Sequence, residues 1–225
     1  MTASSGRWIL VGPDHLERWL TRFTRTHGHL SVSADETAVL LVGQDGNRAE
    51  CHVPFPPLVV DLSAPYAGLV AHVLTERRVG VLLVRLGGHA AGVFTGKRLT
   101  ASKVGSRLVH GRNSAGGWSQ QRFARRREAQ VRAALTAAAD VAASVLLPAV
   151  GDLDAVVLGG DRRSLDVVLR DPRLSSLRPL VLESRVGVPD PRLRVLEQTP
   201  RQFRAARIRV SNPVGSEAAP EDALP

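Results

Sequence analysis

The stretch Gly80-Val-Leu-Leu-Val-Arg-Leu86, followed by Gly87-Gly88, decides the fold of this chain. A near-continuous apolar run of this length between glycines is typical of a buried β-strand. Two further strands are predicted over residues 89–95 and 98–110, because Gly96-Lys97 provides a second turn between them. These three segments therefore predict an antiparallel meander.

A long helix and then a strand–helix–strand unit are expected after the meander. Ser119 is the expected N-cap of the long helix. Its apolar stripe consists of Val131, Leu135, Ala138, Ala142 and Val145. A strand is predicted over residues 155–158, a helix capped by Asp161 follows, and a last strand lies near residues 180–183. Because a strand–helix–strand unit favours parallel pairing, the fold class is mixed α/β, with an antiparallel meander extended by parallel strands and covered by helices.

The chain divides into three parts by composition and patterning. Residues 1–78 predict a small α+β unit, with a helix from about Asp14 to His27 and a hairpin whose turn is Gln44-Asp45-Gly46-Asn47. Residues 79–199 hold the mixed sheet. Residues 200–225 are expected to be a C-terminal extension that is partly disordered, because the pattern weakens and the end is rich in Pro, Ala and Glu.

The positive charge is concentrated in the middle of the chain. Residues 1–79 carry 7 Lys/Arg and 8 Asp/Glu, which gives −1, and residues 133–225 carry 12 of each, which gives 0. Residues 80–132 carry 11 Lys/Arg and a single acid, Glu128, which gives +10. A basic block of this kind indicates a polyanionic partner such as RNA, although a solvated basic face without a partner has the same composition.

Several classes of chemistry are not supported by the sequence. His27-x-His29 and Cys51-His52 are isolated pairs without zinc-ligand spacing, so neither a metal nor another cofactor is expected. The sequence has no phosphate-binding glycine motif and no nucleophile elbow. The single cysteine fits a reducing, cytoplasmic setting. The N-terminus lacks a signal-peptide layout, and the absence of a run of about 18 apolar residues argues against a membrane span.

Residues 110–130 read His-Gly-Arg-Asn-Ser-Ala-Gly-Gly-Trp-Ser-Gln-Gln-Arg-Phe-Ala-Arg-Arg-Arg-Glu-Ala-Gln. A glycine-rich loop thus leads through Gln120 and Gln121 into an arginine-rich helix start. Unpaired backbone N–H groups at a helix N-terminus, together with a side-chain amide, can orient a water molecule and stabilise an oxyanion. The candidate phosphate-binding residues are Lys103, Arg107, Arg112, Arg122, Arg125, Arg126 and Arg127. An ordinary loop before a solvated basic helix remains the alternative.

This segment resembles the catalytic middle domain of eukaryotic and archaeal class-1 release factors. The shared features are His110-Gly111-Arg112, then Gly116-Gly117, then Arg122-Phe123-Ala124-Arg125, with Val156-Val157-Leu158-Gly159-Gly160 downstream. In place of a Gly-Gly-Gln triplet, the chain has Gly116-Gly117-Trp118-Ser119-Gln120. This looser form is similar to the release-factor-like peptidyl-tRNA hydrolases of ribosome quality control, and in particular to an actinobacterial branch of that bacterial group.

The resemblance implies that residues 79–199 are a catalytic domain that hydrolyses the peptidyl-tRNA ester on stalled or split ribosomes. Gln120 or Gln121 would position the water, with Gln120 favoured, and Gly116 and Gly117 would let the backbone approach the tRNA end. The expected partners are the rRNA of the large ribosomal subunit and peptidyl-tRNA. Alternatives are a ribosome-docking module without catalysis, a nuclease acting near the tRNA 3′ end, and a plain RNA-binding protein.

Overall fold

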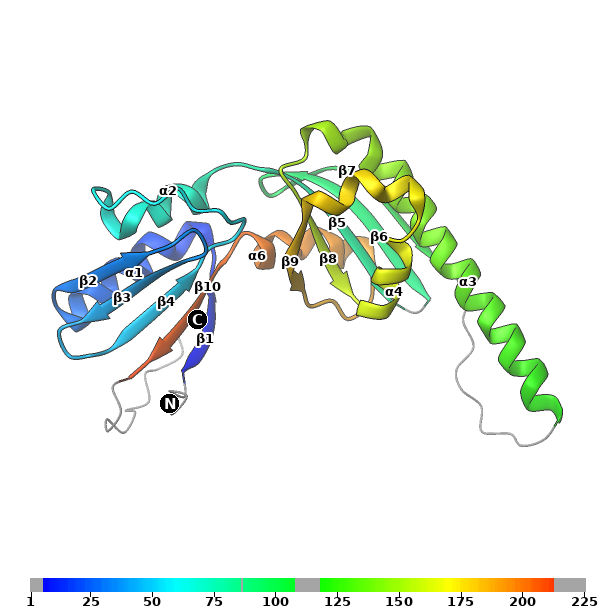
Figure 1. Ribbon diagram of the computed structural model, residues 1–225, viewed down its shortest axis with the longest axis horizontal. Helices are drawn as coiled ribbons and strands as arrows, with labels where there is room; N and C mark the ends of the chain where they lie inside the picture. The colour runs from blue at the N-terminus through cyan, green and yellow to red at the C-terminus, as the bar shows by residue number, and fades with distance from the viewer. Residues whose placement is uncertain (1–5, 86, 108–117, 213–225) are drawn as a thin grey trace. The chain divides into compact units, whose positions relative to one another are not determined.

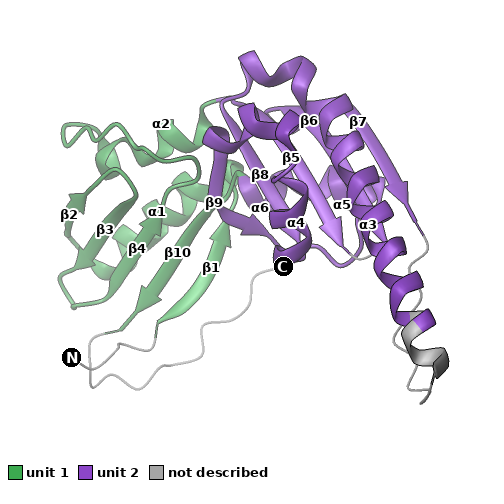
Figure 2. Ribbon diagram, turned by 45° about the vertical axis from the view of Figure 1, so that its right-hand side comes forward, with its two compact units in different colours: residues 1–75, 204–225 green, residues 76–203 purple. Residues whose placement is uncertain are grey.

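The computed structural model describes residues 6–85, 87–107 and 118–212, and for residues 118–121 and 123 it describes the backbone only. The chain forms two compact units (Figure 2). Unit 1 comprises residues 1–75 and 204–225, and unit 2 comprises residues 76–203. The chain therefore leaves unit 1 once, builds the whole of unit 2, and returns to unit 1.

Unit 1 is a five-stranded antiparallel sheet with helices on one face. Its strands, in the order β1-β10-β4-β3-β2, are β1 (Arg7–Val11), β10 (Ala206–Ser211), β4 (Arg48–His52), β3 (Ala38–Gly43) and β2 (Leu30–Ala34). Its helices are α1 (Pro13–His27), the 3₁₀ helix η1 (Pro65–Gly68) and α2 (Leu69–Leu74). The core is formed between the sheet and α1, where Leu16, Leu20 and Phe23 are buried. The predicted α+β fold and the hairpin between β3 and β4 are confirmed.

The prediction of a separate C-terminal extension from residue 200 is wrong for the part that the structure describes. Residues 206–211 form β10, which pairs antiparallel with both β1 and β4 inside the sheet of unit 1. Ala206 and Ile208 are fully buried in its core. The physical reason is the alternation of small or apolar residues with arginine, which gives the strand one buried and one exposed face. Residues 213–225 lie outside the described residues.

Unit 2 contains the predicted mixed sheet. Its strands, in the order β7-β6-β5-β8-β9, are β7 (Arg98–Ser106), β6 (Gly88–Thr95), β5 (Arg78–Arg85), β8 (Ala155–Gly160) and β9 (Val181–Val186). Strands β5, β6 and β7 form the antiparallel meander. Strand β8 pairs in parallel with β5, and β9 pairs in parallel with β8, so the two strands extend the meander. The predicted fold class, an antiparallel meander extended by parallel strands, is therefore confirmed.

Helices cover both faces of this sheet. They are α3 (Trp118–Leu146), η2 (Leu147–Asp152), α4 (Arg162–Val168), η3 (Pro172–Leu180), α5 (Leu193–Gln198) and α6 (Pro200–Phe203). On one face, α3 and α4 pack on side chains such as Leu82, Val156 and Leu158. On the other face, the Phe203 ring of α6 meets the Phe94 ring of β6 edge-on at 5.7 Å between centroids. The three inner strands β6, β5 and β8 are thus buried on both sides, which explains why they are nearly continuous apolar runs.

Helix α3 is the longest element, and its start differs from the prediction. Ser119 lies inside the helix, which begins at Trp118, so it is not the N-cap. Residues 124–152, in α3 and η2, are long and apolar enough to cross a membrane by length and composition. However, Ala138, Ala142 and Leu146 are buried completely against the sheet. We therefore interpret this segment as the core helix of unit 2.

Candidate functional site

Helix α3 has an exposed half and a buried half. From Arg122 to Arg132 its described side chains are exposed or half-buried, whereas burial begins at Ala134 and is complete at Ala138. In Figure 1, the exposed half extends beyond the strands on which the buried half packs. Alanines let the buried half approach the sheet closely and anchor the helix there. We call residues 122–132 the arginine arm.

The two candidate glutamines lie at the N-terminal end of α3. Gln120 and Gln121 are the third and fourth residues of a helix that begins at Trp118. The first four backbone N–H groups of a helix have no partner within it, and the positive end of the helix dipole lies at the same place. The glutamines therefore occupy a position where backbone donors and the dipole favour developing negative charge. Two other predicted residues, Gly116 and Gly117, lie outside the described residues, as does Arg112.

The predicted arginines of α3 are brought together on the arginine arm. Arg122, Arg125 and Arg126 are exposed, and Arg127 is half-buried. Arg122 lies three and four residues from Arg125 and Arg126, so the three side chains share one side of the helix. Like charges at these spacings destabilise a helix by about 0.2–0.5 kcal/mol per pair. An anionic ligand on this side would remove that repulsion.

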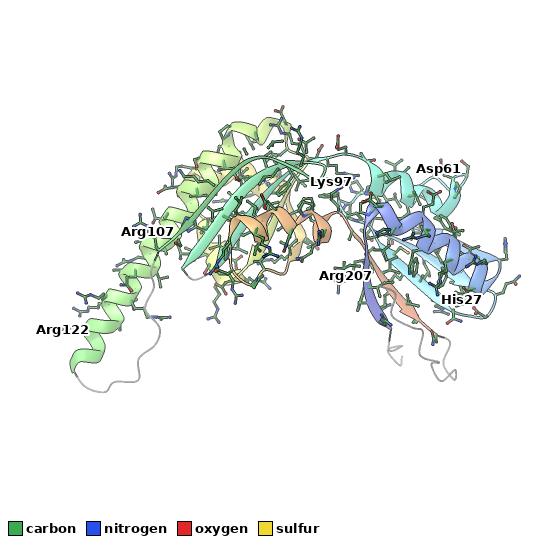
Figure 3. The ribbon with its side chains drawn as sticks, turned by 180° about the vertical axis from the view of Figure 1, so that it is seen from behind. His27, Asp61, Lys97, Arg107, Arg122 and Arg207 are labelled. Atoms are coloured by element: carbon green, nitrogen blue, oxygen red, sulfur yellow. The ribbon has the colours of Figure 1, made fainter. Side chains whose placement is uncertain are left out.

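Of two further predicted cations, Lys103 lies on β7, the outer strand beside α3, and Arg107 follows directly after it. Lys103 is exposed and stands opposite Ala91 of β6, whose side chain belongs to the core beneath α3. Directly opposed residues of antiparallel strands share a face, so Lys103 lies on the α3 side of the sheet. Arg107 is exposed, and its backbone N–H donates to the carbonyl oxygen of Gly87 at 2.9 Å. Figure 3 shows Arg107 and Arg122 on the same side of unit 2.

The strand end that precedes the candidate loop rests on a buried histidine. His89 is only 4% exposed, and it stands opposite Gly105 in the pairing of β6 with β7. A Cβ atom at Gly105 would overlap the His89 ring, so only glycine allows β7 to lie this close. Burial, and to a smaller extent the charge of Arg107, lowers the pKa of His89. His89 is thus a packing residue beside the end of β7.

Sequence reasoning missed His89 and Gly105. Both lie in a strand pair that was predicted correctly, but a histidine within an apolar strand has no distinctive spacing. Their positions, 21 residues (His89) and 5 residues (Gly105) before His110, become informative only once the register of β6 and β7 is known. These two residues position the strand and have no predicted chemistry of their own.

Unit 2 thus combines an antiparallel meander, a long helix with a basic N-terminal part, and a parallel extension of the sheet. The chain belongs to the Actinobacteria/chloroflexi VLRF1 release factor family, whose model matches residues 77–209. The match covers 133 of the 225 residues (209 − 77 + 1) and includes all of unit 2 except Glu76. The predicted membership of an actinobacterial release-factor-like branch is therefore confirmed.

Similar solved structures include two archaeal proteins. The archaeal translation termination factor aRF1 has 14% identity and a TM-score of 0.43, with 90% of this chain and 68% of that chain covered. Pelota from Archaeoglobus fulgidus has 12% identity and a TM-score of 0.30, with 88% of this chain and 62% of that chain covered. Among curated proteins, none matches this chain.

Proposed function

We propose that this protein hydrolyses the ester between nascent peptide and tRNA on the large ribosomal subunit. The observation that carries the proposal is the place of Gln120, in the first turn of a long helix whose next turns present exposed arginines. Membership of a release factor family supports the same reaction. Stalled or split ribosomes in the cytoplasm are the proposed setting.

In the proposed reaction, the Gln120 side-chain amide orients a water molecule toward the ester carbonyl carbon. The water oxygen forms a bond to this carbon, and the bond from the carbon to the 3′ oxygen of the tRNA breaks. The water supplies the proton that the leaving oxygen takes up, so the products are a free peptide carboxyl group and an intact tRNA. Helix N–H groups stabilise the oxyanion that forms on the way.

Proton transfer in this scheme needs the ribosome. The only acid of the arginine arm is Glu128, two turns along the helix from Gln120. The tRNA terminal hydroxyl and the rRNA are therefore proposed to relay the proton. The arginines Arg122, Arg125 and Arg126 would hold RNA phosphates and set the position of the helix end. As a consequence, ribosome-bound peptidyl-tRNA should react much faster than free peptidyl-tRNA.

The test uses large ribosomal subunits that carry labelled peptidyl-tRNA, with peptide, tRNA and the tRNA 3′ end resolved on a gel. Gln120→Ala is expected to lower the rate of peptide release at least about 100-fold, the usual cost of losing one oxyanion or water contact. Gln121→Ala tests the neighbouring candidate. Gln198→Ala is the matched control, because Gln198 is an exposed glutamine at the end of α5, on the other face of the sheet.

Each outcome separates this reaction from its alternatives. Released peptide with full-length tRNA, lost in Gln120→Ala and retained in Gln198→Ala, supports the proposal. A large loss in Gln121→Ala alone would move the catalytic role to that residue. A shortened tRNA would indicate a nuclease. Tight binding to the subunit without any release would leave a docking module.

A further inference from the structure

The sheet of unit 1 has one covered face and one open face. On the covered face, α1 and α2 pack over Val39, Leu41, Ala49, Cys51 and Ile208. Because side chains alternate along a strand, the intervening residues point to the opposite face. Its members on the three neighbouring strands β1, β10 and β4 are Trp8, Leu10, Arg207, Arg209, Ser211, Arg48, Glu50 and His52. We call this set the open face.

An exposed tryptophan of the edge strand β1 belongs to this set. Trp8 is 41% exposed, and the Arg207 guanidinium carbon lies 4.2 Å from the centroid of its ring. The Arg209 guanidinium carbon lies 5.7 Å from the same ring. The His52 ring lies at 5.3 Å between centroids, tilted by 58°. Trp8 thus stands among planar cationic and aromatic groups on an accessible sheet surface, and Figure 3 marks Arg207 on β10.

The charge of the open face is positive after its internal ion pairs are taken into account. Glu50 is its one acid, and Glu50 already bonds to Arg209 at 2.6 Å and to His52 at 2.9 Å. Arg48 and Arg207 are exposed cations that this acid does not pair with in the described residues. Counting Arg48, Arg207 and Arg209 against Glu50 gives +2. A ligand that is complementary to the open face would combine negative charge with a flat apolar surface.

We propose that the open face of unit 1 binds single-stranded RNA, with a base stacked on the Trp8–Arg207 pair and a phosphate at Arg48. Base stacking on aromatic side chains and on guanidinium planes is the usual way in which a β-sheet holds unpaired RNA. An acidic protein segment would satisfy the charge but would leave the stacked planar groups without a role. This surface lies in unit 1 and is independent of the proposed catalysis at α3.

The indole N–H signals of ¹⁵N-labelled full-length protein provide a site-specific test. The chain has three tryptophans, Trp8, Trp19 and Trp118, so their signals can be assigned by single Trp→Phe variants. Trp19 is the internal reference, because it is half-buried on α1 and stacked on Phe23 at 5.4 Å between ring centroids. The probes are a single-stranded RNA decamer of uridines and adenines, the corresponding RNA duplex, and a decameric polyglutamate peptide.

The single-stranded RNA is expected to shift the Trp8 signal and to leave Trp19 in place, with smaller effects of the duplex and the peptide. A shift of Trp118 alone would overturn the proposal, because RNA would then bind only at α3. A Trp8 shift with polyglutamate and not with RNA would also overturn it and would indicate a protein partner.

Variants test the stacking role separately from folding. In a chain that carries Arg122→Gln and Arg126→Gln to weaken binding at α3, Trp8→Ala is expected to reduce affinity for the decamer about fivefold or more, and Trp8→Phe by much less. The matched control is Leu62→Ala, which truncates an exposed apolar side chain of unit 1 (72% exposed) that is not part of the open face. Arg207→Gln should reduce affinity without truncating the indole. Equal losses in Leu62→Ala and Trp8→Ala, or no loss in Arg207→Gln, would refute the stacking model.

Discussion

The salt dependence of RNA binding gives a quantitative test of the basic surface of unit 2. The perturbation is the double variant Arg122→Gln/Arg126→Gln, which removes two exposed charges from one side of the arginine arm. Glutamine keeps high helix propensity, so the helix should persist. If these arginines contact phosphates, the variant releases fewer counterions on binding, and its affinity should depend less steeply on salt.

The magnitude follows from the number of exposed cations on this surface. The set comprises Lys103, Arg107, Arg122, Arg125, Arg126 and Arg132. Each phosphate contact contributes about 0.7–0.9 to the slope of log affinity against log salt, so six contacts give a slope of about −4 to −5. Losing two contacts reduces the slope by about 1.4–1.8. Between 50 and 200 mM salt, the wild type should therefore lose about tenfold more affinity than the variant.

The assay is fluorescence anisotropy of labelled tRNA titrated with protein at four or more salt concentrations. The matched control is Arg194→Gln/Arg201→Gln, which removes two exposed charges from α5 and α6, on the face of the sheet opposite α3. The control should keep the wild-type slope. A slope that changes equally in both double variants would show only a general charge effect, and a slope that changes in neither would refute the assignment of the arm to RNA.

Three further predictions concern the scaffold. Gly160→Ala should destabilise the fold by about 2 kcal/mol or more, because the φ angle of Gly160 is +107° and the new Cβ would overlap a carbonyl of β5. In the control Gly151→Ala, the new Cβ would have no neighbouring atom within 4 Å, so the melting temperature should stay nearly unchanged. Asp161→Ala should cost about 1 kcal/mol in a denaturant titration, because the Asp161 carboxylate caps α4; no change would contradict the cap. The pKa of His89 is lowered by burial and by Arg107, so the folded state releases this proton at lower pH than the unfolded chain. Stability from His89 should be complete above about pH 6.5 and lost as pH falls, and His89→Gln should flatten that loss in melting temperatures measured from pH 7.5 to 5.

The fold of unit 2 could be predicted from local patterns because its elements follow one another along the chain. The strands of the meander are joined by short turns, and each apolar run is bounded by glycine, so pairing of neighbours was the simplest solution. The inner position of β10, between β1 and β4, could not be predicted in this way. Its alternation Ala206-Arg207-Ile208-Arg209 indicates a strand, but its partners β1 and β4 lie about 150–200 residues earlier. Nothing local specifies such a pairing.

The sequence indicates which residues form the candidate site, but it does not indicate how they are arranged on α3. The basic block and the paired glutamines are visible in the sequence, and the structure places Gln120 and Gln121 at one helix end with the arginines behind them. The division of α3 into an anchored half and an exposed arm is not visible, because helical periodicity continues across Arg132 and Ala134. Only the extent of the sheet, which ends beneath the buried half, determines where the arm begins.

After unit 2, which carries one proposed RNA surface, the chain returns to unit 1 and contributes residues to the other proposed RNA surface. Strand β10 lies between β1 and β4, so without it β1 would lose its partner and the open face would lose Arg207 and Arg209. A fragment that ends before residue 206 would therefore lack both the stacking pair and an inner strand of the sheet. The family match continues to residue 209 and includes most of β10, although this strand belongs to unit 1. The segment that matches the release factor family thus contains the proposed catalytic residues of unit 2 and also the two arginines of β10 in the proposed RNA surface of unit 1.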